Sequence, residues 1–145
     1  MGNALSQQTS WIYHLSQAEI NELDVAIKFL VSSNKSINEI TRKDFPLKVL
    51  ANGIAKWSEE LNSGLGFVLV RGFQAEKYNF EESSLAYWLI GRHLGEPISQ
   101  NSDGEMLVSI RDTGANPNDA NTRLYKTRAE QDFHTDAADI IGLLC

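Results

Sequence analysis

The chain has 145 residues, enough for one ordinary domain but not for two. Hydrophobic residues make up 42% and charged residues 22%, proportions that exclude a disordered tail and are typical of a globular protein. Thirteen basic against nineteen acidic residues give a formal charge of −6, which argues against nucleic acid as a partner. No apolar run is long enough to cross a bilayer, so no membrane partner is expected.

The ends of the chain bear on its location. The first eight residues are polar and lack the basic and apolar regions of a signal peptide. The single cysteine, Cys145, cannot form an internal disulfide, which fits a reducing compartment. These features together predict a cytoplasmic protein.

Helical periodicity dominates the first two-thirds of the chain. Ser16 and Glu19 have the spacing of a capping box, and Asn79 with Glu82 has the same pattern further along. Apolar residues at intervals of three and four then predict helices over 17–33, 46–62 and 80–94. The side chains expected to face the core are Ile20, Leu23, Ile27, Leu30, Val31, Leu47, Leu50, Ile54, Trp57, Leu61, Leu85, Trp88 and Leu89.

Extended structure is predicted elsewhere. A short apolar run bounded by glycines predicts a buried strand over 66–72. Further strands are expected over 106–111 and 124–126, with a loop rich in Gly, Asn and Pro over 113–121. Segments 133–136 and 140–144 also have an extended, apolar character. Helices followed by strands indicate an α+β fold rather than alternating βαβ units.

The residues with the clearest chemistry are His134 and Asp136, two positions apart. On a strand, both side chains point to the same face, so an imidazole nitrogen and a carboxylate oxygen converge on one point. Two histidines and one carboxylate on one face of an octahedron form the facial triad of non-haem iron(II) oxygenases. Taken alone, the pattern also describes a histidine paired with a carboxylate in a turn.

Three blocks of sequence resemble the TauD/TfdA family of Fe(II)/2-oxoglutarate-dependent dioxygenases, especially its clavaminate-synthase-like branch. The first is Gly66 to Phe73. The second is Ile90 to Asn101, followed by Gly104 and a stretch through Arg111 and Asp112. The third, and the most specific, is Phe133 to Asp136 leading into Asp139 to Cys145.

The resemblance implies a fold, a reaction and a partial site. The fold would be N-terminal helices over about 1–95, then the first strands of a double-stranded β-helix (a jelly roll) over about 96–145, so that 1–145 is one partial dioxygenase domain. The reaction would oxidise a small-molecule substrate, usually by hydroxylation, with dioxygen and with decarboxylation of 2-oxoglutarate to succinate. His134 and Asp136 would be two of the Fe(II) ligands and the catalytic residues.

Family members carry a second ligand histidine and an arginine for 2-oxoglutarate further downstream, and neither falls within these 145 residues. The chain is therefore interpreted as the N-terminal part of an oxygenase, inactive alone, with the missing C-terminal half of the same protein as a candidate partner. Two alternatives stay open: a truncated or degenerate relative that only binds, and a small metal-binding β-domain unrelated to oxygenases.

Other polar residues are weaker candidates. Arg111 and Gln100 flank a predicted strand near the site and could contact substrate, although strand-end polar residues are usually only solvated. Asp139 could accept a hydrogen bond from His134, or could simply be a turn residue. His93, at the end of a predicted helix, and His14 are expected to be structural rather than ligands.

Overall fold

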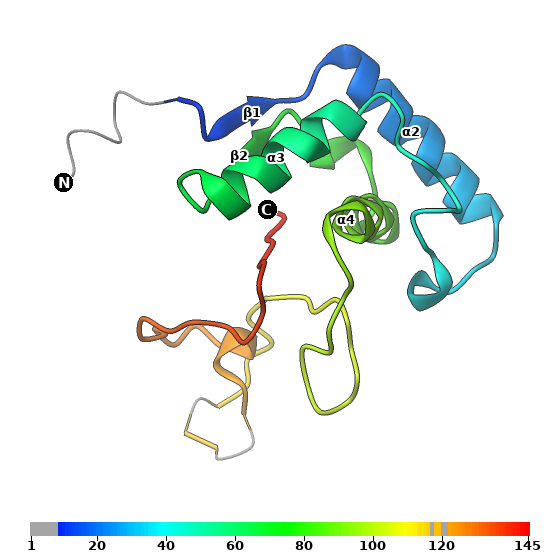
Figure 1. Cartoon of the computed structure of the whole chain (residues 1–145). Helices are drawn as coiled ribbons and strands as arrows, with labels where there is room; N and C mark the ends of the chain where they lie inside the picture. Colours follow the sequence, from blue (N-terminus) through cyan, green and yellow to red (C-terminus); the bar gives the residue numbers. More distant parts are fainter. Residues whose placement is uncertain (1–8, 117, 120–121) are drawn as a thin grey trace. The chain divides into compact units, whose positions relative to one another are not determined.

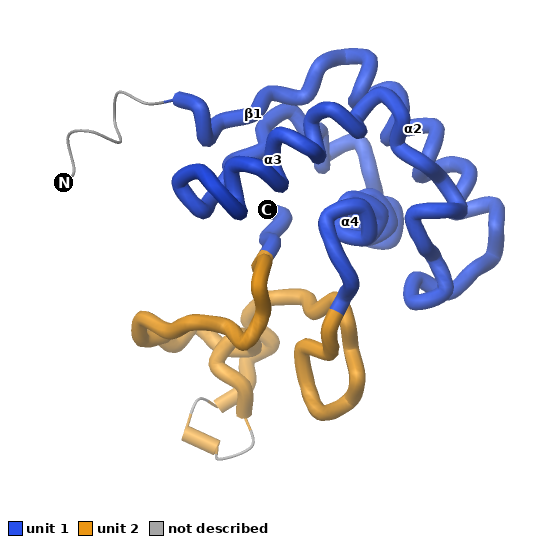
Figure 2. Tube along the Cα trace, in the orientation of Figure 1, with its two compact units in different colours: residues 1–97, 142–145 blue, residues 98–141 orange. Residues whose placement is uncertain are grey.

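A computed structural model describes residues 9–116, 118–119 and 122–145, so the polar N-terminus considered above lies outside the described residues. The chain divides into two compact units (Figure 2). The helical unit comprises residues 9–97 and 142–145, and the second, called the 98–141 unit, comprises residues 98–141.

The helical unit holds the regular elements labelled in Figure 1. Two short strands, β1 (Ile12–His14) and β2 (Leu69–Arg71), pair in parallel with Tyr13 opposite Val70. The predicted strand over 66–72 is therefore shorter than expected, and β1 was not predicted from the sequence. Together with the helices, this pair confirms the α+β class.

The first helix, α2 (Gln17–Ser32), confirms the sequence prediction within one residue. The predicted capping box forms: the Ser16 backbone N–H donates to Glu19 at 2.7 Å, and the Glu19 N–H donates back to the Ser16 hydroxyl at 3.4 Å. The Tyr13 hydroxyl also donates to Glu19, at 2.6 Å, and joins β1 to the start of this helix. Although burial alone would raise the pKa of Glu19, the bonds from Tyr13 and Ser16 outweigh it and lower this pKa.

The second helix, α3 (Ala51–Ser63), begins later than the predicted residue 46. Residues 48–50 form a turn and not the first turn of the helix. The N–H groups of Val49 and Leu50 point toward α2. The Glu22 carboxylate accepts from the Val49 N–H at 2.9 Å and from the Leu50 N–H at 2.8 Å. A carboxylate from another helix thus satisfies donors that the start of a helix leaves unpaired, a long-range contact that local periodicity does not reveal.

The third helix, α4 (Phe80–Leu94), has the predicted bounds and packs against both α2 and α3. Asn79 caps it in a complete capping box with Glu82. The Trp88 indole N–H donates to the buried Ile40 carbonyl at 3.0 Å, which ties α4 to the loop that follows α2. The buried apolar side chains are Leu15, Ile20, Leu23, Ala26, Ile27, Leu30, Ile40, Leu47, Leu50, Ile54, Trp57, Leu85, Ala86, Trp88 and Leu89.

Two members of the predicted core differ. Val31, in the last turn of α2, is exposed, and Leu61, near the end of α3, is half-buried. Leu30, which directly precedes Val31 in the same turn, is buried, so the position along the helix does not by itself decide burial. None of the described helices is both long enough and apolar enough to cross a membrane.

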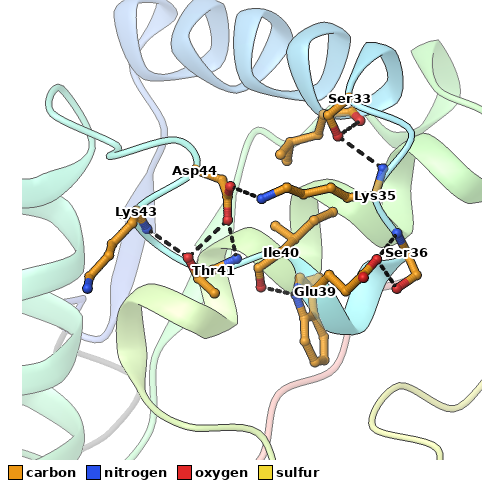
Figure 3. Close-up of polar contacts among 10 residues, drawn as sticks. Ser33, Lys35, Ser36, Glu39, Ile40, Thr41, Lys43 and Asp44 are labelled. Atoms are coloured by element: carbon orange, nitrogen blue, oxygen red, sulfur yellow. Dashed lines mark hydrogen bonds and ion pairs between the residues drawn. The ribbon is translucent and has the colours of Figure 1, made fainter.

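The loop between α2 and α3 is organised by polar side chains (Figure 3). Thr41 donates to the Asp44 carboxylate through its N–H at 2.8 Å and its hydroxyl at 2.9 Å, and Lys35 forms an ion pair with the same carboxylate. The bonds from Lys35 and Thr41 lower the pKa of Asp44 to about 2. In the same loop, the Ser36 N–H and hydroxyl both donate to the Glu39 carboxylate (Figure 3).

The 98–141 unit has little regular structure, and two strand predictions are wrong. Residues 106–111 form no strand, and Leu124–Lys126 form a short 3-10 helix. The Arg111 N–H donates to the Tyr125 carbonyl at 3.2 Å and the Thr113 N–H to the Lys126 carbonyl at 2.9 Å. An extended segment needs a full ladder of partner groups to become a strand, and these two bonds do not supply one. The described part of the predicted loop 113–121 is irregular, while residues 117, 120 and 121 lie outside the described residues.

Candidate metal site

The candidate ligands lie on an exposed irregular segment of the 98–141 unit. Residues 131–136 carry no helix or strand, and the chain bends at Phe133, whose side chain is fully exposed. His134 and Asp136 thus belong to no strand and to no helix. Their side chains nevertheless lie on the same side of the backbone: His134 Nε2 is 3.9 Å from Asp136 Oδ1.

A backbone carbonyl fixes the imidazole of His134. The ring Nδ1 lies 2.9 Å from the Asp132 carbonyl oxygen, which can only accept, so Nδ1 carries the proton. In the neutral ring, Nε2 then keeps a free lone pair on the side nearest Asp136. Metal-bound histidines are usually held in this way, with the second ring nitrogen donating to a carbonyl or carboxylate.

The two donors fit part of an iron site. Neighbouring ligands of an octahedral ion at about 2.1 Å lie roughly 3 Å apart, somewhat closer than the 3.9 Å between Nε2 and Oδ1. Both side chains are more than half exposed, at 57% and 54%, so small side-chain rotations can close this difference. Imidazole nitrogen with carboxylate oxygen is a donor set that suits Fe(II).

A third donor is missing from the structure as described. Over residues 9–116, 118–119 and 122–145, no group of three or more His, Cys, Asp or Glu side chains is placed to hold a metal ion. The arrangement therefore offers two candidate ligands and leaves most of a coordination sphere to other groups.

The other two histidines do not supply a third ligand in the described structure. In His93, Nδ1 lies 2.9 Å from the Leu89 carbonyl and Nε2 accepts from the Leu47 N–H at 3.3 Å, so both ring nitrogens are engaged. His14 belongs to β1, opposite Arg71. Both residues lie in the helical unit. A structural role for His93 agrees with its position at the end of α4.

The weaker candidates lie on the surface without converging on His134. The Gln100 side chain donates to the Ile98 carbonyl at 3.0 Å, a local turn contact. Arg111 and Asp139 are exposed, and no described residue bonds to the side chain of either. The partner of His134 that sequence reasoning missed is the Asp132 carbonyl, which no side-chain pattern could have indicated because every residue carries the same group.

Comparison with known proteins gives two informative relatives. The chain is 32% identical over 138 residues to the FR-33289 synthase of Streptomyces rubellomurinus, an alignment that covers 94% of this chain and 41% of that protein. It is 22% identical over 152 residues to the taurine hydroxylase-like protein SAT17 of Stachybotrys chartarum, covering 100% of this chain and 40% of that protein. No family model matches the chain. The chain thus spans about 40% of the length of the curated relatives it matches.

Proposed function

We propose that His134 and Asp136 are two ligands of a non-haem Fe(II) in a 2-oxoglutarate-dependent dioxygenase of the TauD/TfdA type. The similarity to an FR-33289 synthase and to a taurine hydroxylase-like protein supports this proposal. The observation that carries the proposal is the 3.9 Å approach of the His134 imidazole, whose Nδ1 faces the Asp132 carbonyl, to the Asp136 carboxylate. When bound, Fe(II) supplies the centre at which 2-oxoglutarate and dioxygen react.

The residues of this chain have defined parts in that site. The Asp132 carbonyl holds the proton on Nδ1 of His134, which leaves Nε2 free to bind a metal ion. The Asp136 carboxylate brings a negative charge that partly balances a divalent cation. Because both side chains are exposed, the site also needs covering groups that keep water away from the reaction.

The proposed site needs further groups besides His134 and Asp136. A third ligand and a cationic partner for 2-oxoglutarate would come from sequence beyond the segment shared with the relatives. Residues 109–111 and 140–144 are exposed and carry no regular structure, so they would be open to pairing with further strands in a jelly roll. The substrate would be a small molecule, hydroxylated with formation of succinate.

The proposal is tested by anaerobic titration of the chain with Fe(II). We expect binding that His134→Ala and Asp136→Ala each weaken by at least about tenfold, because each removes a direct ligand. The matched controls are His14→Ala and Asp103→Ala, which should bind like the wild type. Equal weakening in the controls, or unchanged binding in the His134 and Asp136 variants, would remove the proposed ligands.

Catalysis is tested separately on the natural-length protein. Succinate formation from 2-oxoglutarate in the presence of Fe(II) and dioxygen should be abolished by His134→Ala and retained in His14→Ala. Metal binding at His134 without any succinate would favour the alternative of a protein that only binds.

A further inference from the structure

A cavity of about 320 Å³ lies in the helical unit, remote in sequence from His134 and Asp136. It is formed by the second half of α3, the start of the chain around β1 and a residue just before β2. Its volume is within the range of small-molecule sites in proteins. The residues that line it include Tyr13, Lys56, Trp57, Glu59, Glu60 and Val68.

An aromatic corner forms one side of the cavity. Tyr13 and Trp57 pack edge to face, with ring centroids 5.2 Å apart. Trp57 is only 3% exposed, yet its indole N–H has no acceptor among the described residues. A buried donor without an acceptor is costly, and a guest whose acceptor group reached this N–H after a shift of the lining side chains would remove that cost.

Charged side chains of both signs line the same cavity. Lys56 is followed by Glu59 and Glu60 at spacings that often produce ion pairs on a helix. No ion pair of the described residues joins Lys56 to either carboxylate, although Glu60 accepts from the Leu65 N–H at 2.9 Å through one oxygen. The Lys56 charge also acts on Glu19, whose pKa it helps to lower, although no ion pair of the described residues joins the two. A cation and two carboxylates thus line the cavity without an ion pair between them.

We propose that this cavity binds a small zwitterion of the amino-acid class. Its carboxylate would meet Lys56 and, after a small shift of the lining side chains, the Trp57 N–H. Its ammonium group would meet Glu59 and Glu60, and a short apolar side chain would lie against Val68. A ligand with only one of the two charges leaves half of these groups unpaired, so the site discriminates by charge pattern.

The probes for the test are three compounds with a common apolar part. L-Leucine carries both charges, 4-methylpentanoate only the carboxylate, and 3-methylbutylamine only the ammonium group. Isothermal titration of the full chain should show L-leucine binding at least tenfold more tightly than either of the others. Absence of L-leucine binding, or equal binding of all three, overturns the proposal.

Surface variants locate the site. Lys56→Met and Glu59→Gln should each weaken L-leucine binding by at least tenfold, while Lys28→Met and Glu81→Gln, equally exposed and outside the cavity, should leave it unchanged. Trp57→Phe keeps the ring but removes the N–H, and should weaken binding by a smaller factor, about fivefold. If that variant unfolds, the two surface variants still decide. Equal losses in the control variants overturn the proposal.

Discussion

The helical unit and the 98–141 unit differ in how their backbone groups and apolar side chains are satisfied. In the helical unit, three helices with capping contacts surround a continuous apolar core. In the 98–141 unit, turn bonds hold an exposed chain that includes His134 and Asp136. Segments with few buried contacts have low local stability. The comparison therefore separates the part that supplies stability from the part that supplies the proposed chemistry.

The largest expected effect comes from the core of the helical unit. Leu89 on α4 is 0% exposed, whereas Ile110 in the 98–141 unit is 64% exposed. Leu89→Ala should lower the free energy of unfolding by about 2–5 kcal/mol, because it removes buried methyl groups and leaves a cavity. Ile110→Ala should change it by no more than about 0.5 kcal/mol. Urea denaturation checks both, and similar losses would contradict the division between the units.

The next effect concerns the contact between α2 and the start of α3. Glu22→Ala removes the acceptor for the Val49 and Leu50 N–H groups, so it should cost about 1–2 kcal/mol of unfolding free energy. Glu76→Ala, which removes an exposed carboxylate of the same unit, serves as the control and should be close to neutral. Urea denaturation measures both variants. A neutral Glu22→Ala would show that α3 begins at Ala51 for another reason.

The smallest effect is a pH dependence within the helical unit. The pKa of Asp44 is lowered from 3.8 to about 2, so its contribution to stability is present above about pH 4 and is lost as the pH falls toward 2. Asp44→Asn should therefore make the melting temperature less dependent on pH between about pH 4 and pH 2. Asp103→Asn, in the 98–141 unit, is the control and should follow the wild type. Parallel curves for wild type and Asp44→Asn would contradict the assigned contacts.

The same division explains what could be predicted from the sequence. Helix α4 and the capping of α2 were predicted correctly because their signals are local: periodic apolar residues and a polar residue at the first turn. The start of α3 was placed too early because it depends on Glu22, which lies 28 residues before Leu50. The strands over 106–111 and 124–126 were wrong because apolar patterning identifies a strand only when a partner strand is present.

For the candidate site, the sequence predicted which two residues come together but not how. An extended segment was expected to place both side chains on one face. The segment belongs to no strand and bends at Phe133, and the Asp132 carbonyl holds the His134 ring. Asp139, expected as a candidate partner of His134, has no such contact in the described structure. The role of both residues as metal ligands stays a prediction.

The three histidines of the chain allow that role to be measured directly. In a proton NMR spectrum, anaerobic addition of equimolar Fe(II) should broaden the ring signals of His134 beyond detection, because a paramagnetic ion bound at Nε2 lies in direct contact with the ring. The signals of His14 and His93, which are not proposed as ligands, should broaden less than those of His134. A His134 signal that survives, or equal broadening of all three histidines, would contradict a metal site at His134 and Asp136.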